Sequence, residues 1–214
     1  MQDLIKQEIF ELEVLDRLNS GRLLPRLVFG GGTMLRLCHG LERFSVDLDF
    51  WLKGASKPDF FARIQSCLSE FYTLSDAADK YHTWLIELKS PMYPRSLKIE
   101  IRKDAGTFRT EKTIAYSRFT PVQVLVNSVT LHDMALSKIK AFLQRREIRD
   151  VYDLEFLYKR GALPEISPVD RQNLREGIAA LTRQDYHVKL GSLLEEPLRS
   201  YYRQENFKIL MSAL

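Results

Sequence analysis

A run of three glycines between two apolar segments constrains the fold of this chain more than any other feature. The stretch from Val28 to Leu52 reads VFGGGTMLRLCHGLERFSVDLDFWL. The segment RLVF, ending at Phe29, predicts a short strand, and the glycines after it allow positive φ and close approach of the backbone to a ligand. Thr33 is a favourable N-cap for a helix that Gly40 would end. A helix start directly after a strand suits an anion such as a triphosphate.

Two aspartates follow this predicted helix. The segment SVDLDFWL alternates apolar and polar residues, which predicts a half-buried strand. Residues two apart in a strand point the same way, so Asp47 and Asp49 would project together. Two bare carboxylates would raise each other's pKa, whereas Mg²⁺, or Mn²⁺, favours oxygen ligands from carboxylates and phosphates. An isolated D-x-D is more often solvated surface, but beside the glycine turn it predicts a metal site.

A third carboxylate lies in the segment SLKIEIRK. Its apolar residues would face inward, leaving Lys98, Glu100 and Arg102 on the other face. Glu100 would join the aspartates as a metal ligand or accept a proton from an attacking hydroxyl. The alternative is a solvated glutamate between two cations. The segments HTWLIELK and SLKIEIRK, joined by SPMYPR, predict a hairpin.

The order of elements predicts an α+β fold. Helical patterns at residues 2–19 and 58–72 accompany the predicted strands. After about residue 120, apolar residues recur at helical spacing through VQVLVNSV, LHDMALSKIKAFLQRR and DVYDLEFLYKRG, and the last fifty residues also read as helical. We therefore expect an α/β core at 1–125, with a mixed sheet and flanking helices, and a helical region at 126–214 packed on it.

The predicted helix through 131–146 carries a group of charges. Lys138 and Arg145 lie on one edge of its apolar stripe, where Lys138 can reach into a cleft and neutralise phosphates or extend to solvent. Arg146 falls near the middle of the stripe and needs a partner, such as Asp150, Asp153 or a phosphate. Asp150 can instead be an N-cap of the next helix, with Asp153 in capping-box position.

Composition limits the setting of the protein. The 214 residues are 45% hydrophobic and 28% charged, with two cysteines in no CxxC pattern, which is typical of a globular protein in the reducing cytoplasm. The amphipathic N-terminus is not a signal peptide, and no run of eighteen apolar residues predicts a membrane span. The net charge of +4 permits a polyanionic partner.

The blocks FGGGTMLRL, RFSVDLDF and ALSKIKAFLQRREIRDVYDLEFL resemble the AbiEii/AbiGii toxin family of the polymerase-β-like nucleotidyltransferase superfamily. That family includes the MenT toxins of type IV-style toxin–antitoxin systems, and the resemblance spans roughly residues 25–160. It implies a nucleotidyltransferase-type sheet followed by a helical C-terminal part. It also implies an NTP and magnesium as cosubstrates, an RNA acceptor such as the tRNA 3′ end, and an antitoxin that acts without a stable complex.

Carried over by position, the resemblance implies three groups of residues. The nucleotide would be bound by Gly31, Gly32, Thr33, Arg43, Ser45, Lys98, Arg145 and Arg146. The metal would be held by Asp47, Asp49 and Glu100. Those three carboxylates, with Lys138 and Asp150, would be the catalytic residues.

The expected reaction is attack of a ribose hydroxyl on the α-phosphate of the NTP, with pyrophosphate leaving. Three alternatives stay open. A D-x-D glycosyltransferase also uses metal to hold a diphosphate, but it gives no reason for the glycine turn or the Lys138 block. A nucleotide can be transferred to a small molecule or a protein instead of RNA. A non-catalytic module would be a decayed transferase that only binds nucleotide or a partner.

Overall fold

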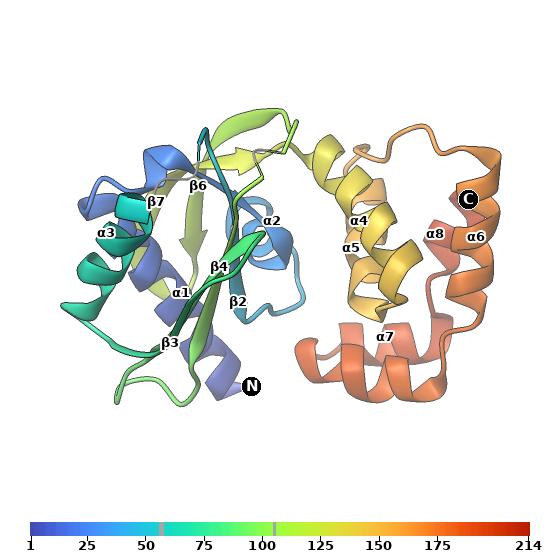
Figure 1. The fold of residues 1–214 in the computed structure, drawn as a ribbon. Helices are drawn as coiled ribbons and strands as arrows, with labels where there is room; N and C mark the ends of the chain where they lie inside the picture. Colours follow the sequence, from blue (N-terminus) through green and yellow to red (C-terminus); the bar gives the residue numbers. More distant parts are fainter. Residues whose placement is uncertain (56–57, 105) are drawn as a thin grey trace. The chain divides into compact units, whose positions relative to one another are not determined.

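A computed structural model describes residues 1–55, 58–104 and 106–214, which form two compact units (Figure 1). Unit 1 comprises Met1–Gly40 and Phe44–Val129. Unit 2 comprises Leu41–Arg43 and Thr130–Leu214. The chain therefore contributes three residues to unit 2 before it returns to the sheet of unit 1, and it enters unit 2 again after the last strand.

Unit 1 is built on a seven-stranded mixed sheet in the order β3-β4-β5-β2-β1-β7-β6. The strands are β1 (Leu27–Gly30), β2 (Asp47–Leu52), β3 (Thr73–Asp79), β4 (Thr83–Lys89), β5 (Leu97–Arg102), β6 (Thr110–Ser117) and β7 (Thr120–Val129). The pairs β2–β5 and β1–β7 are parallel, and the other neighbours are antiparallel. The central position of β2 and β5 fixes which residues of the two predicted acidic segments are neighbours.

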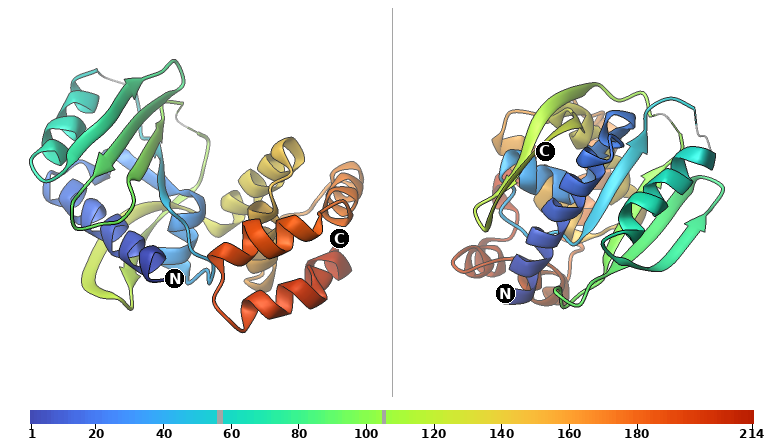
Figure 2. Two further views of the ribbon diagram at one scale, coloured as in Figure 1. Left: turned by 90° about the horizontal axis from the view of Figure 1, so that it is seen from below. Right: turned by 90° about the vertical axis from the view of Figure 1, so that its left-hand side faces the viewer.

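Three α-helices belong to this unit: α1 (Gln2–Ser20), α2 (Gly31–His39) and α3 (Pro58–Ser69), with a short 3-10 turn at Leu24–Arg26. In Figure 2, α1 and α3 lie side by side over one face of the sheet. Alternate residues of the central strands, such as Leu48 on β2 and Ile99 on β5, are fully buried. This alternation places the charged residues of the same strands on the opposite face.

Several sequence expectations for unit 1 are confirmed. The helix predicted at 2–19 is α1, and the predicted hairpin is the antiparallel pair β4–β5. Gly40 ends α2 in the left-handed conformation, with φ of 77°. Thr33 was wrongly expected to be the N-cap, because α2 begins earlier and its N-cap is Gly30, which leaves Thr33 inside the first turn.

The helix expected through VQVLVNSV is wrong, because these residues belong to strand β7. Val124 and Val126 are buried while Leu125 between them is exposed, which is the two-residue period of a strand. A short apolar run fits both periods, and β-branched valines favour the pleated conformation. The segment forms a strand because it pairs with the antiparallel strand β6, which we did not predict.

Unit 2 is helical, as expected. Its elements are α4 (Leu131–Arg145), α5 (Ile148–Lys159), α6 (Pro168–Ala179), a π turn (Asp185–Leu190), a 3-10 turn (Gly191–Leu193), α7 (Leu198–Glu205) and α8 (Lys208–Ala213). Glu155 on α5 is fully buried and joins the C-terminal helices to α5. It accepts hydrogen bonds from the Tyr202 hydroxyl at 2.8 Å and the Leu210 amide at 3.1 Å. Along the described ranges, none of the helices combines the length and apolar character needed to span a lipid bilayer.

Candidate functional site

Strands β2 and β5 bring the predicted carboxylates onto one face of the sheet. In their parallel register, Asp47 is the partner of Lys98 and Asp49 is the partner of Glu100. Partners in neighbouring strands share a face, so the four charged side chains project together. The three carboxylate residues are half-buried and Lys98 is exposed. The residues predicted from two separate segments are therefore adjacent in the fold.

The charges on this face are unequal. The Lys98 ammonium donates a hydrogen bond to Glu100 at 3.0 Å. This bond raises the pKa of Lys98, and the nearby Asp47 and Asp49 carboxylates add to the effect. Asp47, Asp49 and Glu100 bring three carboxylates to one part of this face, and carboxylates this close favour a bound cation. The alternative for Glu100 was a solvated glutamate between two cations; it is half-buried, and Lys98 is its ion-pair partner.

Gly30 and Gly31, at the start of α2, lie against side chains of β2. Gly31 has φ of +73°, and a Cβ added there would come within 2.9 Å of the Asp49 Cγ and closer still to Oδ2. A Cβ added at Gly30 would come within 3.0 Å of the Trp51 ring. The predicted role of these glycines was to make room for a phosphate chain. They have a second role, because the Asp49 carboxylate lies against the backbone that opens α2.

The start of α2 has two properties relevant to an anion. Its N-cap, Gly30, makes no side-chain hydrogen bond to the first turn. The first-turn N–H groups, which include those of Gly32 and Thr33, have no acceptor within the helix. The fully buried Thr33 hydroxyl donates a hydrogen bond to the Asp47 carbonyl oxygen at 2.5 Å. This bond fixes the start of β2 relative to α2.

The donor atoms on this face suit magnesium. In the described ranges 1–55, 58–104 and 106–214, no three or more histidine, cysteine, aspartate or glutamate side chains are grouped as a ready metal site. Magnesium seldom needs such a protein cage, because it usually binds one or two carboxylates together with waters and substrate phosphates. Asp47 and Asp49 supply that number of hard oxygen donors, so the residues present fit the metal.

A buried polar cluster on α1, which we did not predict from the sequence, supports the two acidic strands. Gln7 is fully buried and donates hydrogen bonds to the Val46 and Ser96 carbonyl oxygens, both at 3.3 Å. Glu8 accepts a hydrogen bond from Arg36 on α2 at 2.5 Å. The signal in the sequence was the presence of Gln7 and Glu8 among the buried apolar residues of α1, since polar residues on a buried face need partners. Gln7 thereby holds the residues that precede β2 and β5.

Unit 2 contains a second charged group, which includes Arg43 from the connection after α2. Arg43 donates two hydrogen bonds to Asp153, at 2.6 and 2.7 Å, and both residues are buried. Lys138 lies between two carboxylates, at 2.7 Å from Asp153 and 3.1 Å from Asp150. Burial opposes ionisation of Asp153, but Arg43 and Lys138 hold its pKa below its usual value. Each of these charges is therefore compensated by another.

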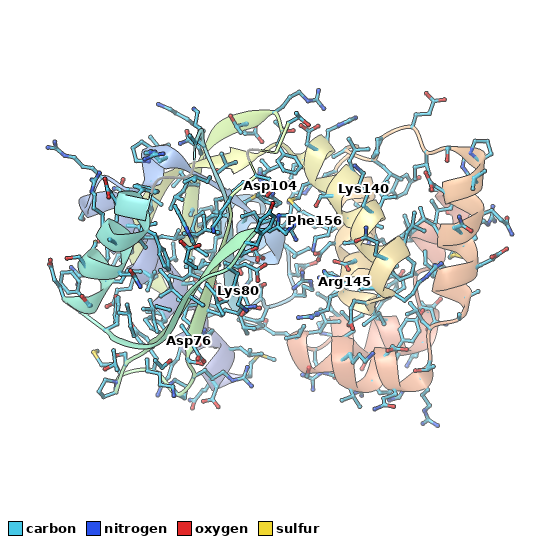
Figure 3. The ribbon with its side chains drawn as sticks, in the orientation of Figure 1. Asp76, Lys80, Asp104, Lys140, Arg145 and Phe156 are labelled. Atoms are coloured by element: carbon cyan, nitrogen blue, oxygen red, sulfur yellow. The ribbon has the colours of Figure 1, made fainter. Side chains whose placement is uncertain are left out.

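The solvent-exposed alternative for Lys138 and the N-cap alternative for Asp150 are both wrong. The Lys138 side chain does not extend to solvent, because it is only 8% exposed. Asp150 is not the N-cap of α5, since that position is Glu147, and Asp150 lies fully buried in the first turn. Arg145, at the end of α4 (Figure 3), donates two hydrogen bonds of 2.7 Å to Asp150.

Arg146 is separate from this group. It ends α4 with a positive φ of 55°, and its guanidinium donates to the Asn173 carbonyl oxygen at 2.8 Å. The prediction that Asp150 or Asp153 is the partner of Arg146 is wrong, because the left-handed conformation at Arg146 turns the chain away from the helical path. Ser45 lies half-buried in unit 1, two residues before Asp47.

Comparisons with known proteins agree with this architecture. A family model described as "Nucleotidyl transferase AbiEii toxin, Type IV TA system" matches residues 13–212. The crystal structure of JHP933 from Helicobacter pylori superposes with a TM-score of 0.60 and 19% identity, covering 97% of this chain and 93% of that one. The crystal structure of a candidate nucleotidyltransferase from H. pylori superposes with a TM-score of 0.59 and 20% identity. It covers 96% of this chain and 95% of that one. Curated proteins give no match. The predicted nucleotidyltransferase-type α+β fold is confirmed.

Proposed function

This chain belongs to the AbiEii family of nucleotidyltransferase toxins of type IV toxin–antitoxin systems, and from that premise we propose that it transfers a nucleotide from an NTP to an RNA acceptor such as the tRNA 3′ end. The observation that carries the proposal is the register of β2 and β5, which sets Asp47 and Asp49 beside Lys98 and Glu100 on one face. Membership of the family also implies an antitoxin partner, which we propose acts without forming a stable complex.

The substrate would be bound at the start of α2. The first-turn N–H groups of Gly32 and Thr33, which have no acceptor within the helix, would donate to the triphosphate, as helix N-termini do for anions. Lys98, exposed on the neighbouring strand, would contribute a positive charge to the same phosphates. Asp47 and Asp49 would hold Mg²⁺ or Mn²⁺, which would neutralise phosphate charge and polarise the phosphoryl group.

The chemical step is an exchange of phosphorus–oxygen bonds. The oxygen of the acceptor hydroxyl forms a bond to the α-phosphorus, and the bond from that phosphorus to the bridging oxygen breaks, releasing pyrophosphate. Glu100 would take the hydroxyl proton, and the Lys98 ammonium beside it would keep that carboxylate oriented. Thr33, by fixing the Asp47 carbonyl, would hold β2 in place during the step.

The charged group of unit 2 is a second requirement in this proposal. Lys138 and Asp150 match the family's helical motif, and in unit 2 their side chains contact each other at 3.1 Å. For Lys138 to bind a phosphate, the phosphate would replace one of its two carboxylate partners. We therefore propose that Lys138 and Asp150 serve transfer as a buried ion pair within unit 2.

Incubation of the protein with labelled NTPs, Mg²⁺ and total RNA tests the proposal. We expect label in RNA of tRNA size with the native protein. Asp47→Asn and Asp49→Asn, alone and together, should abolish it while the fold is kept, as checked by circular dichroism. Chelation with EDTA should stop labelling, and added Mg²⁺ or Mn²⁺ should restore it. Equal labelling by native protein and the double variant would refute the roles of both aspartates.

A further inference from the structure

A surface of unit 1 next to the three carboxylates combines positive charge with an exposed aromatic ring. We infer that it binds the single-stranded end of the RNA acceptor, an inference that rests on the proposed function. We call it the distal surface and define it by Lys53, Lys80, Tyr81, His82 and Arg102. Figure 3 labels Lys80 in the turn between β3 and β4.

Strand pairing brings these residues together from three segments. Arg102, at the end of β5, is the partner of Trp51 on β2 and of Thr83 on β4. The turn between β3 and β4 is tied to the end of β5, because the Lys103 amide donates to the His82 carbonyl oxygen at 2.9 Å. Neighbouring strands lie about 4.8 Å apart, so the segment ends form a row roughly 10 Å wide.

The row has a surplus of cations. The side chains of Lys53, Lys80 and Arg102 are exposed, and in the part of the chain that the structure describes none of them contacts a carboxylate. Asp79 is nearby but forms an ion pair with Lys103. The other acid in these segments is the exposed Asp104, so the segments carry three exposed cations and one further carboxylate. Unpaired cations in a row suit the evenly spaced phosphates of a nucleic acid.

Tyr81 gives the row a means of recognising bases. Its side chain is 88% exposed, so it contributes little to packing. Its ring meets His82 edge-on, with the ring centroids 4.4 Å apart. Exposed aromatic rings between cations are the usual stacking platforms for unpaired bases. An acidic protein partner would use the same charges but would not need a ring presented to solvent.

The distal surface continues the carboxylate face. Arg102 follows Glu100 by two residues on the same face of β5, which places their Cα atoms about 7 Å apart. Its guanidinium lies 5.7 Å from the centre of the Trp51 ring, and that ring is on the same face of β2 as Asp49. An RNA end held along this row would therefore reach the carboxylates without crossing the sheet.

Binding of a fluorescein-labelled single-stranded RNA ending in CCA, measured by fluorescence anisotropy without NTP, tests this inference. Stacking on an aromatic ring contributes about 1–3 kcal/mol per base, so Tyr81→Ala should weaken binding about 5- to 140-fold. Tyr81→Phe should bind like native protein, because the ring is retained. Arg102→Ala and Lys80→Ala should each reduce the slope of log affinity against log salt by about 0.7.

Tyr116→Ala is the matched control. This tyrosine is 54% exposed on β6, at the other edge of the same sheet, and the substitution should leave RNA affinity unchanged. The inference is overturned if Tyr81→Ala binds RNA as tightly as Tyr116→Ala does. It is also overturned if native protein binds polyglutamate as tightly as RNA at the same salt, which would indicate a surface for acidic proteins.

The labelling assay separates this inference from the proposed function. If native protein labels RNA but the Tyr81 and Arg102 variants bind RNA normally, the distal surface is refuted and the transferase function stands. If native protein binds RNA through Tyr81 but labels no acceptor, the proposed function fails and the surface stands. Thermal melts of each variant distinguish lost binding from lost folding, and exposed side chains should change the melting temperature little.

Discussion

Replacing Gly31 by alanine is the sharpest test of the geometry at the start of α2. Two costs follow from the structure. The backbone at Gly31 has φ of +73°, and this left-handed conformation costs a residue with a Cβ about 1–2 kcal/mol. The added Cβ would also come within 2.9 Å of the Asp49 Cβ and Cγ, so the carboxylate must move, and such overpacking typically costs about 1–3 kcal/mol.

Gly54→Ala carries only the cost of the backbone conformation, so the difference between the two variants measures the cost of overpacking. Gly54 has φ of +84°, but a Cβ there would meet no atom within 4 Å. Urea unfolding followed by circular dichroism should show a loss of about 1–2 kcal/mol for Gly54→Ala and about 2–5 kcal/mol for Gly31→Ala. Nucleotidyl transfer should be lost with Gly31→Ala, because Asp49 is displaced, and kept with Gly54→Ala. Equal stabilities and equal activities of the two variants would refute the argument.

Three further predictions concern other buried groups. Asp153→Asn should destabilise the protein by about 3–5 kcal/mol in urea unfolding, because it leaves the buried Arg43 and its neighbours undercompensated. Because the pKa of Asp153 is lower in the folded protein, its ionised carboxylate contributes its full stabilisation above the unfolded pKa of about 3.9, and this contribution is lost as the pH falls through the folded pKa. Asp153→Asn should remove that part of the pH dependence of the unfolding free energy. Thr33→Val should cost about 1–3 kcal/mol and slow transfer, because the Asp47 carbonyl loses its donor. Burial raises the pKa of the Cys38 thiol to about 11, so its alkylation by iodoacetamide at pH 8, followed by mass spectrometry, should be slow until the protein unfolds.

Each of these predictions has an internal control. Glu205→Ala removes an exposed ion pair with Lys208 and should leave the stability nearly unchanged. Thr33→Ser keeps the hydroxyl and should retain transfer activity. Cys67 is less buried than Cys38 and should be alkylated first. A Cys38 that reacts as fast as Cys67 in the folded protein, or an Asp153 variant as stable as Glu205→Ala, would contradict the structure.

The sequence by itself determined the elements whose pattern is local. The glycine run followed by a D-x-D segment predicted the strand, helix and strand at 27–52, and the strict alternation in SLKIEIRK predicted β5 and the face that carries Lys98 and Glu100. These predictions succeed because a two-residue period and a left-handed glycine cap are properties of a few neighbouring residues. VQVLVNSV failed because its run of apolar residues fits a helix and a strand equally, and only pairing with β6 distinguishes them.

Only the tertiary structure decided which charges are neighbours. No spacing in the sequence indicates that Arg43 lies on Asp153, 110 residues away, or that Lys138 lies between two carboxylates. The sequence also does not indicate that position 31 has no room for a side chain, because the atoms that would clash with it belong to Asp49 on β2. Ion pairs and close approaches across the fold depend on strand order and helix packing, which are set by the burial of the whole chain and not by any one segment.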